Sequence, residues 1–188
     1  TNPVNGCKGR DTITVVQNIT APGATAAASG PITCTTGTVQ LTGGPSGQNT
    51  YIWTGPNGFS SSQQNTSTNA AGTYTLQVTS QVNACTSTNT VIVQLNTTAP
   101  TVSIATPGHL NCNNATIQLN ATASAQGANY AYQWTTTSGN IVSGANTLTP
   151  TVNAAGTYTL VITDTSNGCT SSSNTVVIQS PAVSAAIS

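Results

Sequence analysis

Hydrophobic and polar residues alternate with a period of two in several short runs along the chain. Such alternation predicts β-strands that bury one face and expose the other. The clearest runs are TVQLTG at 38–43, TIQLNA at 116–121, TYTLQVT at 73–79, TYTLVIT at 157–163, NTVIVQL at 89–95 and NTVVIQS at 174–180. Clusters of Gly, Asn, Pro and Ser at 54–62 and 137–140 predict turns between them. Since no stretch of useful length carries a helical period, we expect an all-β fold.

The strand runs recur in the same order, which identifies an internal repeat. Residues 71–100 and 155–182 share the motif AGTYTL, a later cysteine and a final strand. The spacing between equivalent positions varies in some intervals and is fixed in others, and the variable intervals mark loops because paired strands do not absorb insertions. The predicted organisation is the last strand or strands of a preceding or donated repeat at 1–22, one repeat at 23–99, a second at 100–182 and a linker to the next repeat at 183–188.

Charged residues are almost absent from the chain. The four charged residues are Lys8, Arg10, Asp11 and Asp164, and the single histidine is His109. With no basic patch to neutralise phosphates, we expect no nucleic-acid partner. Two carboxylates and one imidazole leave almost nothing for acid–base catalysis or a metal site, so we expect no enzyme activity, no metal and no cofactor. No apolar run reaches the roughly 18 residues of a membrane-spanning helix.

Several motifs stand in the same order in both copies. These are Tyr-x-Trp at 51–53 and 132–134, then AGTYTL, then a cysteine, then a last strand that ends near a proline. Together they resemble the immunoglobulin-like and PKD-like repeats of cell-surface adhesins of Bacteroidota, which include gliding-motility adhesins. The resemblance covers nearly the whole chain. It implies tandem small immunoglobulin-like β-sandwiches, like beads on a string, in a filamentous protein that is extracellular and located at the cell surface. The low charge departs from such repeats, which often carry an aspartate after this strand. Here the aspartate is present in only one copy, as Asp164.

The aromatic residues are predicted to be mainly structural. The tryptophans match the buried tryptophan of sandwich folds, and the tyrosines of the AGTYTL motif match corner tyrosines that fix a loop through the hydroxyl. The predicted core residues are Trp53, Trp134, Tyr74 and Tyr158. The aromatic residues left over, Phe59 in the loop at 54–62 and Tyr130, are predicted contacts for a carbohydrate or a receptor.

The five cysteines are expected to be oxidised in a secreted chain. Two pairings stay open. One pairs Cys34 with Cys85 and Cys112 with Cys169, and leaves Cys7 for a partner outside the chain segment. However, an immunoglobulin-like topology places Cys34 and Cys85 at opposite poles of one sandwich, roughly 25 Å apart, whereas a disulfide spans at most about 7 Å between Cα atoms. The other pairing therefore joins Cys34 to Cys169 across the domain junction, and leaves Cys7, Cys85 and Cys112 for partners in neighbouring domains outside the chain segment.

Other covalent features are also predicted from the sequence. An isopeptide bond is not expected, because Lys8 is the only lysine and has only Asp11 nearby, and a junction without acidic clusters should hold no calcium. Asp11-Thr12-Ile13 resembles the O-glycosylation site of Bacteroidota, which makes Thr12 a candidate site. The N-glycosylation pattern occurs at Asn18, Asn65, Asn96, Asn114 and Asn120, as expected by chance in a chain rich in Asn and Thr.

The leading hypothesis is a structural repeat segment of an extracellular adhesin or surface filament, which acts as a stiff spacer or as a fibre-forming element. Its partners would be neighbouring repeats or identical subunits in a filament, and a surface glycan or a host or prey surface. Residues 1–22 could then be a strand donated to a neighbouring subunit. The alternative is a set of polysaccharide-binding accessory β-sandwich modules of a secreted enzyme.

Overall fold

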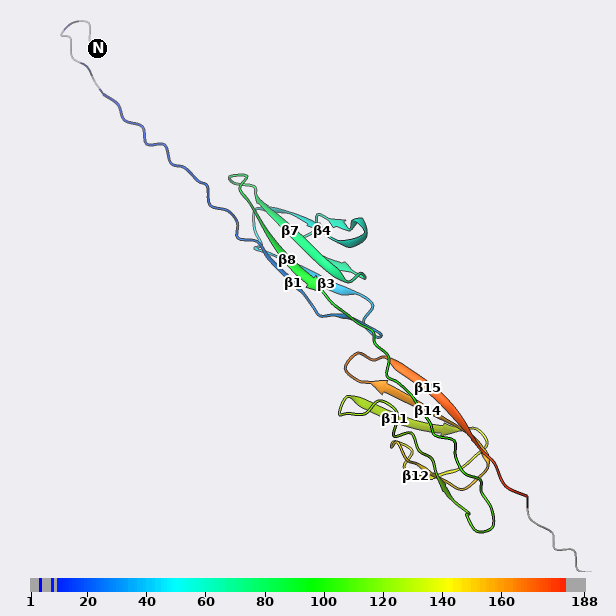
Figure 1. Ribbon diagram of the computed structural model, residues 1–188. Helices are drawn as coiled ribbons and strands as arrows, with labels where there is room; N and C mark the ends of the chain where they lie inside the picture. The colour runs from blue at the N-terminus through cyan, green and yellow to red at the C-terminus, as the bar shows by residue number, and fades with distance from the viewer. Residues whose placement is uncertain (1–3, 5–7, 9, 182–188) are drawn as a thin grey trace, which may run out of the picture. The chain divides into compact units, whose positions relative to one another are not determined.

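The computed structural model describes residues 4, 8 and 10–181. Cys7 and the predicted linker at 183–188 lie outside the described residues. The regular structure of the described residues is β-strand, apart from one 3-10 turn, η1 (Pro56–Gly58) (Figure 1). The chain is therefore all-β, as the alternating pattern predicts.

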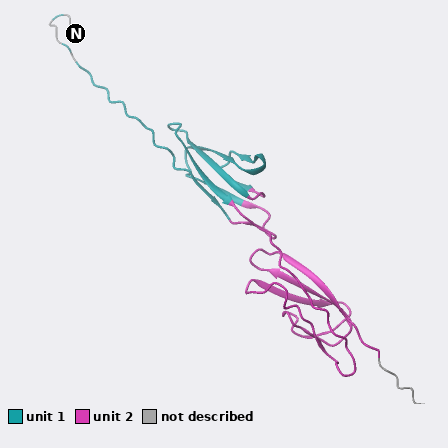
Figure 2. Cartoon of the chain, viewed as in Figure 1, with its two compact units in different colours: residues 1–29, 40–67, 72–92 teal, residues 30–39, 68–71, 93–188 magenta. Residues whose placement is uncertain are grey.

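The chain divides into two compact units (Figure 2). Unit 1 comprises residues 1–29, 40–67 and 72–92, and unit 2 comprises residues 30–39, 68–71 and 93–188. Residues 30–39 lie inside the predicted first repeat but group with unit 2. Each unit contains a small β-sandwich.

Two sheets form the sandwich of unit 1. One sheet has the strand order β1-β3-β6 and the other has the order β5-β4-β7-β8. The strands of these sheets are β1 (Thr25–Ala28), β3 (Val39–Gly44), β4 (Asn49–Thr54), β5 (Ser60–Ser61), β6 (Asn65–Thr68), β7 (Gly72–Ser80) and β8 (Thr86–Val93). Alternate residues of β3 and β7 are buried, so each strand turns its apolar face inward. The buried hydrophobic residues of these strands are Val39, Leu41, Trp53, Tyr74, Leu76, Val78 and Val93, of which Val39 and Val93 stand at strand ends that group with unit 2.

Two three-stranded sheets form the sandwich of unit 2. Their orders are β10-β13-β12 and β11-β14-β15. The bounds are β10 (Ile117–Gln118), β11 (Tyr130–Thr136), β12 (Ile141–Ser143), β13 (Thr151–Val152), β14 (Gly156–Asp164) and β15 (Thr170–Val177). One core cluster joins the two sheets and comprises Leu110, Leu119, Ala121, Trp134, Val152, Tyr158, Leu160, Ile162 and Val177.

Short parallel pairings flank the sandwiches. In unit 2, β2 (Ile32–Thr33) pairs with β9 (Leu95–Asn96), and Leu110 forms an equivalent parallel bridge with Gln179. Residues 10–24 form no strand, and the side chains of residues 11–20 are all exposed.

The last strands begin earlier than the sequence pattern predicts. The strands expected at 89–95 and 174–180 are observed as β8 (Thr86–Val93) and β15 (Thr170–Val177). The Thr- and Ser-rich residues after each cysteine join the ladder because backbone pairing does not require apolar side chains, and Thr itself favours strands. In unit 2, for example, Thr163 pairs with Thr170.

The strand predicted at 116–121 is shorter than the pattern indicates, since β10 spans only Ile117–Gln118. Leu119 and Ala121 remain buried, and their N–H groups donate to the carbonyls of Pro150 and Leu148. Pro150 has no N–H to donate in return, so the two-way ladder stops there.

Candidate functional site

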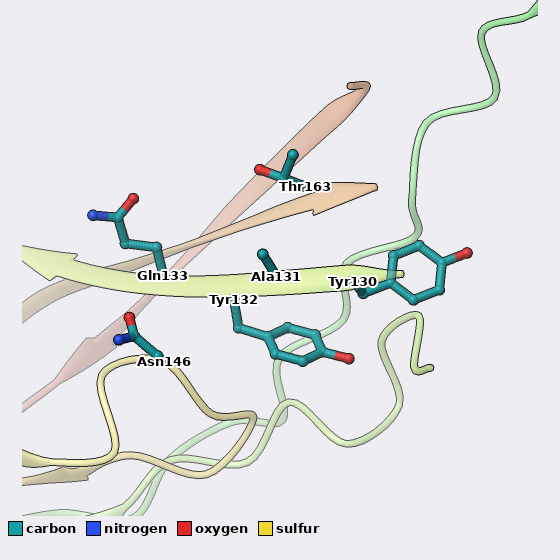
Figure 3. A pocket seen from close by; sticks show the side chains of 6 residues that line it. All are labelled: Tyr130, Ala131, Tyr132, Gln133, Asn146 and Thr163. Atoms are coloured by element: carbon teal, nitrogen blue, oxygen red, sulfur yellow. The ribbon is translucent and has the colours of Figure 1, made fainter. Parts of the chain in front are cut away.

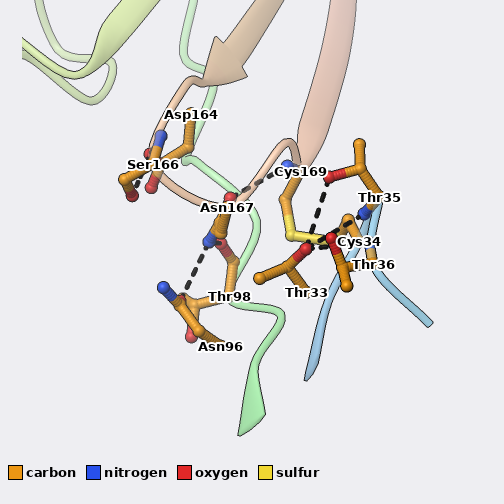
Figure 4. Close-up of a disulfide and its surroundings, with 10 residues drawn as sticks. All are labelled: Thr33, Cys34, Thr35, Thr36, Asn96, Thr98, Asp164, Ser166, Asn167 and Cys169. Atoms are coloured by element: carbon orange, nitrogen blue, oxygen red, sulfur yellow. Dashed lines mark hydrogen bonds between the residues drawn. A yellow bond between two sulfur atoms is a disulfide. The ribbon is translucent and has the colours of Figure 1, made fainter. Parts of the chain in front are cut away.

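A disulfide bond joins Cys34 to Cys169, although 135 residues separate them in the sequence (Figure 4). The two Cα atoms lie 5.1 Å apart, within the usual span of a disulfide. Of the two pairings that the sequence leaves open, the structure contains this one. Cys85 and Cys112, which the other pairing requires, carry free thiols.

Asn167 organises the loop that carries Cys169. Its side chain is only 3% exposed, and its Oδ1 accepts a hydrogen bond from the Cys169 N–H at 2.8 Å. Its Nδ2 donates to Oδ1 of Asn96 at 3.1 Å and to the carbonyl oxygen of Thr98 at 3.0 Å (Figure 4). The buried amide is thus satisfied on both sides, and it ties the loop to the last residue of β9 and to the segment that follows this strand.

Gly168 allows the loop that carries Cys169 to approach the loop that carries Cys34. Its φ is +72°, in the left-handed region that favours glycine. A Cβ atom built on it would lie 2.4 Å from Cγ2 of Thr35, which follows Cys34 in the sequence. A glycine therefore satisfies both the backbone conformation and the close approach of Thr35.

The loop around Cys34 is fixed by a threonine. Thr33 Oγ1 accepts hydrogen bonds from the N–H groups of Thr35 and Thr36, at 3.3 and 2.9 Å. The Cys34 N–H donates to the carbonyl oxygen of Asn167 at 3.1 Å. We use the name clamp for the disulfide together with three residues, Asn167 and its two acceptors Asn96 and Thr98.

The two tryptophans lie in the cores and occupy equivalent positions. Trp53 is fully buried and Trp134 is 3% exposed. Each indole N–H finds a carbonyl acceptor, Gln64 at 3.2 Å in one unit and Thr147 at 2.9 Å in the other. This is the usual requirement for burying a tryptophan, and it accounts for both residues structurally.

The two AGTYTL tyrosines, Tyr74 and Tyr158, are also fully buried. The Tyr158 hydroxyl accepts a hydrogen bond from the Asn140 N–H at 3.0 Å and donates to the Ala154 carbonyl at 2.6 Å. It therefore fixes two loop segments, as a corner tyrosine does.

Phe59 packs on the core of unit 1. Its ring meets the buried Tyr74 ring edge to face, with 5.1 Å between the centroids. Because Phe59 is only partly exposed, part of its apolar surface is already covered within the chain.

Tyr130 lies beside a shallow cavity of about 560 Å³ along β11 (Figure 3). The lining side chains are Tyr130, Ala131, Tyr132, Gln133, Asn146 and Thr163. The strand β11 is an edge strand of its sheet, so the cavity is open to solvent at that edge. The Tyr132 hydroxyl donates to the Ala125 carbonyl at 3.1 Å, which fixes its ring, and the side chains of Gln133 and Asn146 are exposed.

The predicted modification sites are on the surface. Thr12 and the five asparagines of the N-glycosylation pattern are exposed. Among the described residues no group of three or more His, Cys, Asp and Glu side chains gathers where a metal ion could be held. Within the same residues, no helix has the length and apolar character needed to cross a membrane.

Sequence reasoning missed the role of Asn167. The available signal was the motif Asn-x-Cys, which occurs at 5–7, 83–85 and 167–169. An asparagine two residues before a cysteine can accept the cysteine N–H and turn its amide to a neighbouring segment, and both events occur here.

Comparison with solved structures finds several similar chains. The three N-terminal domains of the highly immunogenic outer capsid protein (Hoc) of bacteriophage RB49 match with 17% identity and a TM-score of 0.48, over 84% of this chain and 59% of that chain. Sidekick-1 immunoglobulin domains 1–5 match with 11% identity and a TM-score of 0.33, over 83% and 39%. Surface layer protein SbsC domains 4–9 match with 16% identity and a TM-score of 0.30, over 86% and 31%.

This chain spans less than two thirds of each of these three structures. No protein-family model matches the sequence, and neither does any curated protein.

Proposed function

We propose that this chain is a structural repeat segment of an extracellular adhesin or surface filament, of the type found in Bacteroidota, and that it acts as a stiff spacer without catalytic chemistry. The repeats span residues 23–99 and 100–182 in this proposal, and their partners are neighbouring repeats of the same kind. Any adhesive contact with a glycan or a cell surface would then be made elsewhere in the filament.

The observation that carries the proposal is the clamp. Residues 94–100, a short segment that contains β9 and Pro100, connect β8 to the second proposed repeat. The Cys34–Cys169 bond adds a second covalent tie, and Asn167 holds Asn96 and Thr98 within the segment. A short, proline-containing segment that is bridged in this way has little freedom to bend, which is the property a spacer needs.

The chemistry of the chain supports an extracellular location. A structural disulfide persists in oxidising compartments and is rare in the cytosol. The surface is rich in Thr, Asn and Ser and nearly free of charge, which leaves little for nucleic acid or for catalysis. Thr12 is a candidate O-glycosylation site in this setting, because it is exposed.

Stiffness is tested by small-angle X-ray scattering on the oxidised chain and on the double variant Cys34→Ser, Cys169→Ser. We expect the variant to show a broader distribution of maximum dimensions, because the backbone through residues 94–100 is then the one covalent connection between the two proposed repeats. The matched control is Cys85→Ser, Cys112→Ser, which also removes two cysteines but leaves the clamp intact. Identical scattering from the clamp variant and the control would contradict the proposal.

A second candidate function is polysaccharide binding at the cavity along β11. The favouring observation is the pair of tyrosines, Tyr130 and Tyr132, beside the exposed amides of Gln133 and Asn146. Aromatic rings with nearby amides suit a sugar ring, which presents an apolar face and several hydroxyls. The test is a glycan array with the whole chain and with Tyr130→Ala. Binding that Tyr130→Ala abolishes, and Phe59→Ala does not, would favour this function.

A further inference from the structure

Unit 1 holds a second copy of the clamp residues without a disulfide. The Nδ2 of Asn83 donates to Oδ1 of Asn18 at 3.0 Å and to the carbonyl oxygen of Thr20 at 2.9 Å. By their positions in the repeat, these three residues are equivalent to Asn167, Asn96 and Thr98 of the clamp. Both contacts of the clamp asparagine are thus reproduced, with distances that agree within 0.1 Å.

The loop that carries Cys85 is built in the same way. The Cys85 N–H donates to Oδ1 of Asn83 at 3.0 Å, and the Ser80 N–H donates to the Cys85 carbonyl at 2.9 Å. The corresponding bonds at Cys169 are 2.8 Å to Asn167 and 2.8 Å from Asp164. Cys85 is partly exposed and unpaired, so this side of the clamp is assembled and lacks only the opposite cysteine.

An independent observation comes from the segment before Asn18. Ile13 and Val15 are 91% and 85% exposed. Aligned on their cysteines, the repeats place Val15 at the position of Val93 and of Val177, each of which is 1% exposed in the last strand of its sandwich. Residues 10–15 therefore have the sequence of a last strand, but none of the described strands pairs with them.

We infer that another sandwich of this repeat docks here, with residues 10–20 as its last strand and tail, and that Cys85 forms a disulfide with the cysteine of that sandwich equivalent to Cys34. The inference rests on the proposed function and names its partner. In the reaction, the two thiols lose two protons and two electrons and form one S–S bond. A disulfide oxidant such as oxidised glutathione accepts the electrons and is reduced to two thiols.

Cys112 presents the opposite half of the same connection. Asn111 Oδ1 accepts from the N–H groups of Asn113 and Asn114, both at 2.9 Å, as Thr33 Oγ1 does in the loop of Cys34. Cys112 is exposed and unpaired. The two cysteines that are free among the described residues thus correspond to the two sides of the clamp, Cys85 to Cys169 and Cys112 to Cys34.

One difference between the loops bears on the partner. The residue before Cys85 is Ala84, with φ +58°, where the clamp has Gly168. A Cβ at position 168 would lie 2.4 Å from Thr35 Cγ2, so the partner loop at Cys85 must give way around the Ala84 methyl group. The test therefore includes Ala84→Gly.

The experiment extends the chain with its own repeat. Residues 23–84 are fused to the N-terminus of residues 7–188. In the added copy, Cys7 then takes the position of Cys85, and residues 8–22 supply the last strand and the tail. The substitution Thr38→Ser in the added copy distinguishes its peptides from those of the original repeat. The chain is oxidised in a glutathione redox buffer, with and without Ala84→Gly, and its disulfides are mapped on non-reduced peptides. We expect a bond between Cys34 of the added copy and Cys85, and slow amide exchange at residues 11–15.

The matched control fuses residues 23–100, with their own β8, to the N-terminus of residues 23–188. Cys85 left unpaired in both extended chains, or a bond from the added Cys34 to Cys7, overturns the inference. So does an added copy that folds in the control and not with residues 8–22, or a control in which the added copy does not dock. None of these results affects the scattering test of the clamp, so the two proposals fail separately.

Discussion

The side-chain amide of Asn167 donates a hydrogen bond to the backbone carbonyl of Thr98 at 3.0 Å, while its carbonyl oxygen holds the N–H of Cys169 at 2.8 Å. One buried side chain thus links the cysteine loop to the segment that follows β9. The disulfide fixes the same loop on its other side, through Cys34. A covalent bond and a buried amide therefore restrain one short stretch of backbone.

Asn167→Ala is expected to destabilise unit 2 by about 2 kcal/mol, because it leaves the Cys169 N–H and the Thr98 carbonyl without their partner. The measurement is the denaturant midpoint of the oxidised chain at unchanged slope. Asn113→Ala serves as the control, since Asn113 is exposed in the loop of Cys112. Equal midpoints for the two variants would show that the buried amide contributes nothing.

Comparison of Gly168→Ala with Gly23→Ala separates the two constraints on Gly168, which are its positive φ and its close approach to Thr35. Gly168 and Gly23 both have φ +72°, but a Cβ at Gly23 has no neighbour within 4 Å, whereas one at Gly168 would meet Thr35. Gly23→Ala should therefore cost only the conformational term, about 1 kcal/mol. Gly168→Ala should cost more and slow the formation of the Cys34–Cys169 bond in a refolding assay followed by thiol trapping. If both variants lose the same stability, the contact with Thr35 has no effect.

Much of the fold could be predicted from the sequence, because the period of two and the repeat set the strands and their inner faces. Val39, Leu41, Leu76 and Val78 are buried at the alternate positions that the pattern predicts. The start of β8 at Thr86 was not predictable from apolar alternation, since it rests on backbone pairing of Thr and Ser residues. The role of Asn167 was also missed, because the local motif Asn-x-Cys does not reveal that the amide binds Thr98, which lies 69 positions away.

Tyr158→Phe tests the corner tyrosine. The hydroxyl group of the fully buried Tyr158 ring binds the backbone of Asn140 and Ala154, so its removal leaves partly buried backbone groups unpaired and should cost about 1–2 kcal/mol. Tyr51→Phe is the control, because its hydroxyl donates to Pro45 in an exposed setting, where water replaces it. Thermal unfolding of both variants gives the comparison. A larger loss for Tyr51→Phe would contradict the assignment of Tyr158.

Aspartate substitutions at the three equivalent valines test the inferred last strand. Val93→Asp and Val177→Asp each place a carboxylate in a core, where the residue is 1% exposed, and we expect each to cost about 3 kcal/mol or more. Val15→Asp should change the stability of the 188-residue chain by less than about 0.5 kcal/mol, because Val15 is 85% exposed. In the extended chain, the same substitution should destabilise the added sandwich as strongly as Val93→Asp destabilises unit 1. A Val15→Asp variant that stays neutral in both chains would mean that residues 10–15 do not enter a core.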